Sequence, residues 1–122
     1  MKIERFEDIK AWQEAREIVR QIYCFTGKEY FKKDFGLRDQ IQRASVSIMA
    51  NIAEGFDSKS KLEFIRFLTF ARRSGSEAQS RLYVALDQDY ISKKEFEDIY
   101  LKIGKAKNLI GGFIRYLHEN KQ

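Results

Sequence analysis

Proline is absent from all 122 residues of this chain, while apolar residues recur at helical spacing along most of its length. A proline inside a helix costs about 3 kcal/mol, so a chain without proline is free to form long uninterrupted helices. No segment shows the alternation of apolar and polar residues that is typical of a strand. The length suits one domain, residues 1–122, with a single core of moderate size. The sequence therefore predicts an all-α fold.

Four segments keep the helical period, and polar capping residues mark two of their starts. Ser60 and Ser92 each precede a glutamate by three residues, which is the capping-box pattern. The second helix is expected to be the shortest. Four helices with short connections predict an antiparallel, up-down-up-down four-helix bundle. The expected helices cover residues 7–26, 37–55, 61–88 and 93–118.

The connection between the first two helices has no sustained period and is expected to be a loop. Gly27 is expected to end the first helix in the left-handed conformation, as glycine commonly does. Three aromatic residues follow, and we expect Tyr30, Phe31 and Phe35 to pin this loop to the bundle.

The second helix carries polar and small residues beside its apolar stripe. Ser45 and Ala50 are small enough for a neighbouring backbone to approach closely. An unpaired buried polar group costs about 1–3 kcal/mol, so any polar residue buried here needs a partner. We interpret the polar set as a hydrogen-bond network between helices or subunits that fixes their register; a ligand pocket is the alternative. The candidate members are Gln40, Arg43, Ser47, Asn51, Glu54 and Glu77.

The third helix is apolar over a wide arc. Leu62 and Leu68 follow one stripe, whereas Phe64, Phe67 and Phe70 drift away from it. An arc of this width is typical of a helix that is deeply buried or that meets another subunit. We favour contact with a second subunit, and therefore a homo-oligomer.

The chain is basic, with 23 Lys and Arg against 18 Asp and Glu. A basic chain attracts anionic partners such as RNA or DNA, but a merely solvated surface explains the charge equally well. Contacts of this kind would go to phosphates and carry little sequence specificity. Arg72 and Arg73 have a competing interpretation as subunit contacts. The candidate nucleic-acid contacts are Arg66, Arg72, Arg73 and Arg81 on the third helix and Lys102, Lys105, Lys107 and Arg115 on the fourth.

No group of residues resembles a catalytic or metal-binding constellation. His118 is the one histidine and belongs to no Glu-x-x-His pair, so we predict no catalytic residue, no metal and no cofactor.

Cys24 lies among apolar residues and is expected to be a buried thiol, which suits a reducing cytoplasm. No apolar stretch could serve as a signal peptide or a membrane span. We expect a cytoplasmic protein that is not an enzyme.

The run from Gln40 to Gly55, together with residues 64–68 and 71–77, resembles bacterial four-helix-bundle proteins encoded within intervening sequences of 23S rRNA genes. Residues 6–9 with Trp12 are similar to the start of that family's first helix. The resemblance implies a ring-like homopentamer with no known enzymatic activity. It also implies a relation to the accessory protein of diversity-generating retroelements, a basic pentamer that works with a reverse transcriptase and nucleic acid. Arg73 departs from the pattern, since many relatives carry glycine there.

Two hypotheses for the function follow. The first is a non-enzymatic oligomer that binds RNA or DNA non-specifically through basic surfaces. The second is a structural or protein-interaction scaffold, such as an accessory partner of a nucleic-acid enzyme, that does not itself bind nucleic acid. A small-molecule enzyme is disfavoured because the residues that catalysis requires are missing.

Overall fold

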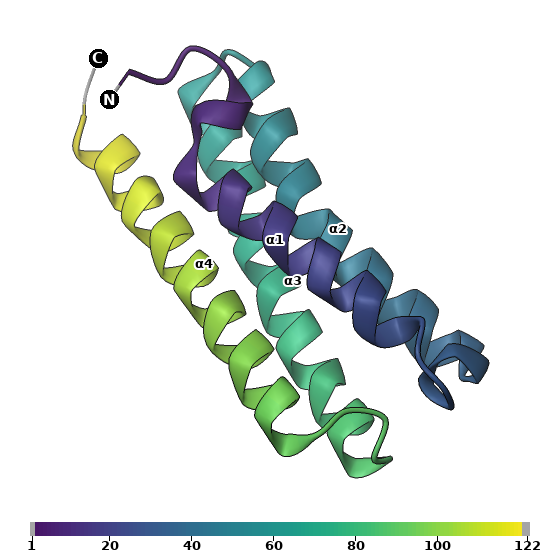
Figure 1. Ribbon diagram of the computed structural model, residues 1–122. Helices are drawn as coiled ribbons and strands as arrows, with labels where there is room; N and C mark the ends of the chain where they lie inside the picture. Colours follow the sequence, from purple (N-terminus) through teal and green to yellow (C-terminus); the bar gives the residue numbers. More distant parts are fainter. Residues whose placement is uncertain (1, 121–122) are drawn as a thin grey trace.

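The computed structural model describes residues 2–120 and shows four long helices packed side by side (Figure 1). No strand occurs between residues 2 and 120. This confirms the prediction of an all-α fold with four helices. The elements in chain order are the 3₁₀ turn η1 (Phe6–Asp8), α1 (Lys10–Thr26), the 3₁₀ turn η2 (Phe31–Lys33), α2 (Phe35–Asp57), α3 (Lys61–Asp87) and α4 (Lys93–Glu119).

The first two helices differ most from their predicted bounds. Ile9 is extended, with φ −78° and ψ 122°, and it separates η1 from α1, so the first α-helix begins at Lys10 instead of residue 7. The side chain of Asp34 accepts a hydrogen bond from Leu37 N (3.2 Å) and starts α2 two residues earlier than predicted. The prediction that the second helix is the shortest is wrong, because α1 has 17 residues and α2 has 23.

The two predicted capping boxes form to different extents. At α4, Ser92 Oγ accepts from Glu95 N (3.0 Å), and the Glu95 carboxylate accepts from Ser92 N (2.8 Å). This backbone hydrogen bond holds the pKa of Glu95 below its ordinary value. At α3, Ser60 Oγ accepts from Glu63 N (3.2 Å), but the Glu63 carboxylate pairs with Arg66 (3.1 Å). Only the serine half of the predicted box therefore forms at α3.

Each helix packs against two others: α1 and α3 both lie against α2 and α4. The core between them consists of two buried clusters. One is centred on Ile22, Phe31 and Ile99, and the other contains Ile52 and Leu68. Burial of such side chains contributes about 1.5–3 kcal/mol each, so these clusters supply most of the drive for folding.

Several side chains expected in the interior are exposed. Cys24 is exposed, and the prediction of a buried thiol is wrong. The core face of α1 runs through Ile18, Ile22 and Phe25, which share one side of a helix at this spacing, and residue 24 lies outside it. Leu62 is 78% exposed in the first turn of α3 and contributes nothing to the core.

The loop after α1 also differs from expectation. Gly27 has a φ of −88°, in the right-handed region, so it does not end α1 in the left-handed conformation. Of the three aromatic residues, only Phe31 is buried, where it stacks on Tyr90 with ring centroids 5.1 Å apart. Tyr30 and Phe35, which lie on either side of η2, are exposed instead.

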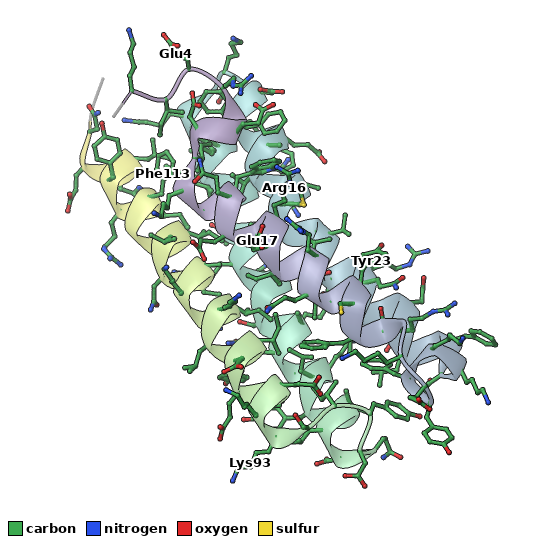
Figure 2. All side chains as sticks on the ribbon, in the orientation of Figure 1. Glu4, Arg16, Glu17, Tyr23, Lys93 and Phe113 are labelled. Carbon is green, nitrogen blue, oxygen red and sulfur yellow. The ribbon has the colours of Figure 1, made fainter. Side chains whose placement is uncertain are left out.

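The two ends of the bundle are distinct. Residues 2 and 120 lie at one end (Figure 1), and Figure 2 shows Glu4 and Phe113 there and Lys93 at the other. At that other end, Tyr90 OH donates to Asp34 Oδ2 (3.0 Å) and joins the start of α2 to the segment after α3. We call this second end, formed by residues 27–35 and 88–92, the Tyr30 end.

Candidate functional site

A shallow polar groove follows the seam between α2 and α3. It consists of two adjoining hollows of about 490 and 280 Å³ that share Ser47 and Glu77. We call it the α2–α3 groove. Its lining residues are Gln40, Arg43, Ala44, Ser47 and Asn51 from α2 and Phe70, Arg73, Ser74, Glu77 and Arg81 from α3.

A short chain of hydrogen bonds crosses this groove. Asn51 Nδ2 donates to Ser47 Oγ (2.9 Å) and to the Ser47 carbonyl (2.8 Å). Ser74 Oγ donates to Ser47 Oγ (2.8 Å) and so connects α3 to α2. Ser74 was not among the predicted network members, because nothing in the sequence separates a serine that faces another helix from one that bonds its own backbone.

The other predicted network members are placed differently. Arg43 pairs with Asp39 one turn earlier on α2 (2.9 Å), and Arg81 pairs with Glu77 on α3. Gln40 and Glu54 are exposed. Of the predicted members, Ser47 therefore bonds to the other helix across the groove, through Ser74, which was not predicted. Ion pairs within single helices flank this bond.

Arg66 extends the same side of the molecule toward the start of α3. Its guanidinium lies over the rings of Phe67 and Phe70, 5.2 Å from each centroid, and also pairs with Glu63. Arg73 follows two turns later and lines the α2–α3 groove. Arg66, Arg73 and Arg81 thus share the α2–α3 side, as their spacing along one helix predicts.

On the α3–α4 side, two cations lie in gaps left by glycines. A Cβ atom at Gly75 would meet the Lys107 stem at 2.9 Å, and one at Gly111 would meet Arg72 Nη1 at 3.0 Å. Lys107 Nζ also donates to the amide oxygen of Gln79 (2.9 Å). The missing side chains of Gly75 and Gly111 therefore allow these cationic side chains to lie against the opposite helix.

A second guanidinium reaches the same glycine. Arg115 Nη1 is 3.9 Å from the position of a Cβ at Gly111, so Arg72 and Arg115 both come within 4 Å of one point. Within residues 2–120, neither these two arginines nor Lys107 has a carboxylate oxygen within 4.0 Å. We call Arg72, Lys107 and Arg115 the basic strip. Like charges gathered without counter-ions raise the local positive potential and favour an anion between them.

The remaining two cations belong to a third side. Lys105 Nζ lies 3.6 Å from Glu14 of α1, and Lys102 precedes it by one turn on α4. The eight cations predicted as nucleic-acid contacts are consequently distributed over three sides of the bundle. The structure brings together three of them without counter-ions, on the α3–α4 side.

Groups with chemical reactivity do not gather in the same way. Across the described part of the chain, residues 2–120, no three His, Cys, Asp or Glu side chains come together as ligands for a metal ion. Within the same range, no helix combines the length and the hydropathy needed to cross a bilayer. Tyr83 lies beside Tyr100 on the α3–α4 side, and this neighbour raises the pKa of Tyr83.

Two of the comparisons with known proteins give matches to the chain. A family model described as 23S rRNA-intervening sequence protein matches residues 7–112. A crystal structure from Bacteroides thetaiotaomicron, of a protein with unknown function from the S23 ribosomal protein family, is similar with a TM-score of 0.78 and 27% identity. The likeness covers 85% of this chain and 97% of that one. No curated protein sequence matches.

Proposed function

Because the chain belongs to the 23S rRNA-intervening sequence protein family, we propose that it is a non-enzymatic cytoplasmic protein that binds RNA or DNA without sequence specificity. The family match covers the segments on which the resemblance was based, residues 40–55, 64–68 and 71–77. The basic strip is the observation that carries the proposal.

The chemistry of the strip suits a phosphate backbone. A guanidinium presents two parallel N–H donors to phosphate oxygens, and charge-assisted hydrogen bonds of this kind are about twice as strong as neutral ones. Arg72 and Arg115, from two helices, both come within 4 Å of the position of a Cβ at the buried Gly111. Contacts to phosphate position a nucleic acid but do not read its bases, so we expect little sequence preference.

We further propose that the bundle is antiparallel, in up-down-up-down order, and that it assembles as a homopentamer. The contact of Asp34 with Tyr90 and the ion pair of Lys28 with Glu95 (3.3 Å) support the antiparallel order. The α2–α3 groove, with the Arg66 side chain stacked beside it, is the surface that we assign to subunit contact. A ring would carry several copies of the basic strip, and their combined affinity for an anionic partner would be much higher than that of one copy.

Charge removal at the strip tests the proposal. The variant Arg72→Ala with Arg115→Ala should bind a generic duplex about tenfold more weakly at ~50 mM salt. Its plot of log K against log salt should flatten by about 0.9 for each phosphate that the variant no longer neutralises. The matched control is Arg16→Ala with Arg20→Ala on α1, which removes the same charge from exposed positions and should change the affinity less than about threefold.

Two results would overturn the proposal. The first is a wild-type protein that fails to bind either duplex or single strands at low salt. The second is an equal loss of affinity in the strip variant and in its α1 control, since binding would then follow net charge and not the strip. Molar mass in solution, measured beside these titrations, tests the proposed pentamer independently.

The alternative is a scaffold that contacts protein and not nucleic acid. Leu62 and Leu101 favour it, because they are large apolar side chains that are 78% and 70% exposed. A partner protein that stays bound after nuclease treatment, and no longer binds when Leu62→Ser and Leu101→Ser are introduced, would support the scaffold. Wild-type binding of nucleic acid by the purified protein would contradict it.

A further inference from the structure

Two exposed aromatic side chains lie together at the Tyr30 end of the bundle. Tyr30 is 70% exposed and Phe35 is 67% exposed. Both line an open hollow of about 890 Å³, and its other lining residues are Lys33, Asp34, Gly36, Gln88, Asp89 and Tyr90. Rings that leave so much apolar surface in water gain free energy when a flat partner covers them.

Cations accompany both rings. Lys33 Nζ lies 6.0 Å from the ring centroid of Tyr30, and Arg38 Cζ lies 5.0 Å from that of Phe35. Arg38 Nη1 also donates to the Lys32 carbonyl (2.9 Å), which fixes the guanidinium close to the loop. Within residues 2–120, none of Lys32, Lys33 and Arg38 has a carboxylate within 4.0 Å. Aromatic rings and free cations therefore alternate on one small surface.

The backbone beneath this surface is held in place. The two oxygens of the Asp34 carboxylate accept hydrogen bonds from Leu37 N (3.2 Å) and Tyr90 OH (3.0 Å). The bond to Asp34 also raises the pKa of Tyr90. Phe31 anchors the loop in the core from below. Asp34 is thus engaged on both oxygens, and Asp89 is the other acidic residue that lines the hollow. The rings are presented by an ordered loop.

Gly36 leaves the hollow open beside Phe35. A Cβ atom at this position would have no neighbour within 4 Å. Its backbone φ is not in the left-handed region, so no backbone conformation requires glycine here. Glycine in a helix costs about 1 kcal/mol relative to alanine, and at this position the structure gives it no packing role.

We propose that the Tyr30 end stacks unpaired nucleobases on Tyr30 and Phe35 while Lys33 and Arg38 contact the adjoining phosphates. This inference rests on the proposed function and deepens it, because it adds a preference for single strands that the basic strip alone does not supply. Every nucleobase has a flat face, so stacking tolerates any sequence, whereas the bases of a duplex are covered by their neighbours. An unpaired base with its phosphate comes either from a strand or from a free nucleotide.

The double variant Tyr30→Ala with Phe35→Ala separates this surface from the basic strip. We expect it to bind a single strand of about 12 nucleotides at least tenfold more weakly than wild type and to bind the matched duplex within about twofold. The control is Tyr116→Ala, which removes a tyrosine that is 58% exposed near the end of α4, far from the Tyr30 end. The control should leave both affinities within about twofold of wild type.

A blocking variant tests the same surface without removing the rings. Gly36→Leu places a side chain in the open hollow, and its Cβ meets no existing atom, so the melting temperature should stay equal or rise. Its affinity for the single strand should fall about tenfold, as in the double variant. A strand carrying 5-iodouracil, cross-linked by light to the wild-type protein, should attach to the peptide that contains Tyr30 or Phe35.

The outcomes distinguish this inference from the proposed function. Wild-type protein that binds neither strand nor duplex overturns both. Wild-type protein that binds, together with a double variant that loses strand and duplex affinity equally or loses neither, overturns the stacking surface alone. A double variant with an altered molar mass also overturns it, since the rings would then be subunit contacts. If a mononucleotide at millimolar concentration displaces the single strand, the Tyr30 end binds nucleobases, and we assign a free nucleotide as its ligand.

Discussion

The seam between α2 and α3 and the seam between α3 and α4 both contain glycine, but different atoms lie opposite. A Cβ at Gly55 would stand 2.7 Å from Phe67 Cβ and 3.4 Å from Phe64 Cα, atoms that belong to or adjoin the α3 backbone. A Cβ at Gly111 would meet only the far ends of two side chains, Arg72 Nη1 at 3.0 Å and Arg115 Nη1 at 3.9 Å. The contact at Gly55 depends on the distance between two helices, whereas the contacts at Gly111 depend on flexible side chains.

This difference separates two uses of glycine. On the α2–α3 seam, glycine permits close approach of two helices, and enlarging it forces the helices apart. On the α3–α4 seam, glycine makes room for cations whose stems can move to another rotamer. The α2–α3 seam is therefore expected to determine the stability of the fold. The α3–α4 seam is expected to determine how the side chains of the basic strip are arranged on the surface.

Gly55→Ala should produce the largest effect. Overpacking typically costs about 1–3 kcal/mol, and neither opposing carbon can move without moving α3, so we expect a loss of about 2 kcal/mol. Chemical denaturation at fixed protein concentration measures it. An unchanged denaturation midpoint would show that the α2–α3 seam accommodates the added methyl group. The two seams would then not differ in rigidity.

Substitutions beside the groove should follow. Ala50→Phe and Asn51→Leu are expected to disturb folding or assembly more than Arg66→Ala does, at about 1–2 kcal/mol each. Ala50 is half-buried, and Asn51 donates two hydrogen bonds to Ser47, whereas Arg66 is exposed. Molar mass and melting temperature report assembly and folding together. Normal values for Ala50→Phe would contradict the close contact proposed for this side.

Ser74→Ala isolates the single hydrogen bond that joins the two helices across the groove. We expect a loss of about 1 kcal/mol, which is typical for one such bond. Ser76→Ala is the matched control, because Ser76 is an exposed serine on the same helix. Equal melting temperatures for the two variants would mean that the Ser47–Ser74 hydrogen bond does not contribute to the stability of the protein.

The smallest effects, of opposite sign, are expected at the adjacent glycines Gly111 and Gly112 of α4. Gly112→Ala should gain about 0.5–1 kcal/mol from helix propensity, because its Cβ would have only an ordinary contact with Arg115 at 3.8 Å. Gly111→Ala should gain less, since Arg72 has to shift. Thermal denaturation of both variants checks the signs. A loss as large as that of Gly55→Ala would show that the two seams are equally rigid.

The sequence predicted the helices well because their signals are local. The apolar period and the serine caps placed the starts of α3 and α4 at the observed residues, 61 and 93. The start of α1 was missed because an extended residue, Ile9, lies within an otherwise continuous period. Local signals thus identify which segments are helical but miss a single residue that leaves the helical conformation.

The candidate site was less predictable, because it depends on how each helix is rotated against its neighbours. Spacing along α3 placed Arg66 and Arg73 on one side, but it carries no information on which cations of α3 and α4 meet. Lys105 pairs with Glu14 on α1, while Arg115 joins Arg72 over Gly111. These are contacts between helices distant in sequence, and a single sequence carries no signal for them.

Residues 2 and 120 lie at one end of the bundle, and Tyr30 and Phe35 lie at the opposite end. Any polypeptide joined before residue 2 or after residue 120, natural or engineered, leaves the bundle on the side remote from the two rings. A fluorescent reporter or a surface tether attached at either position should therefore leave the Tyr30 end accessible from solution.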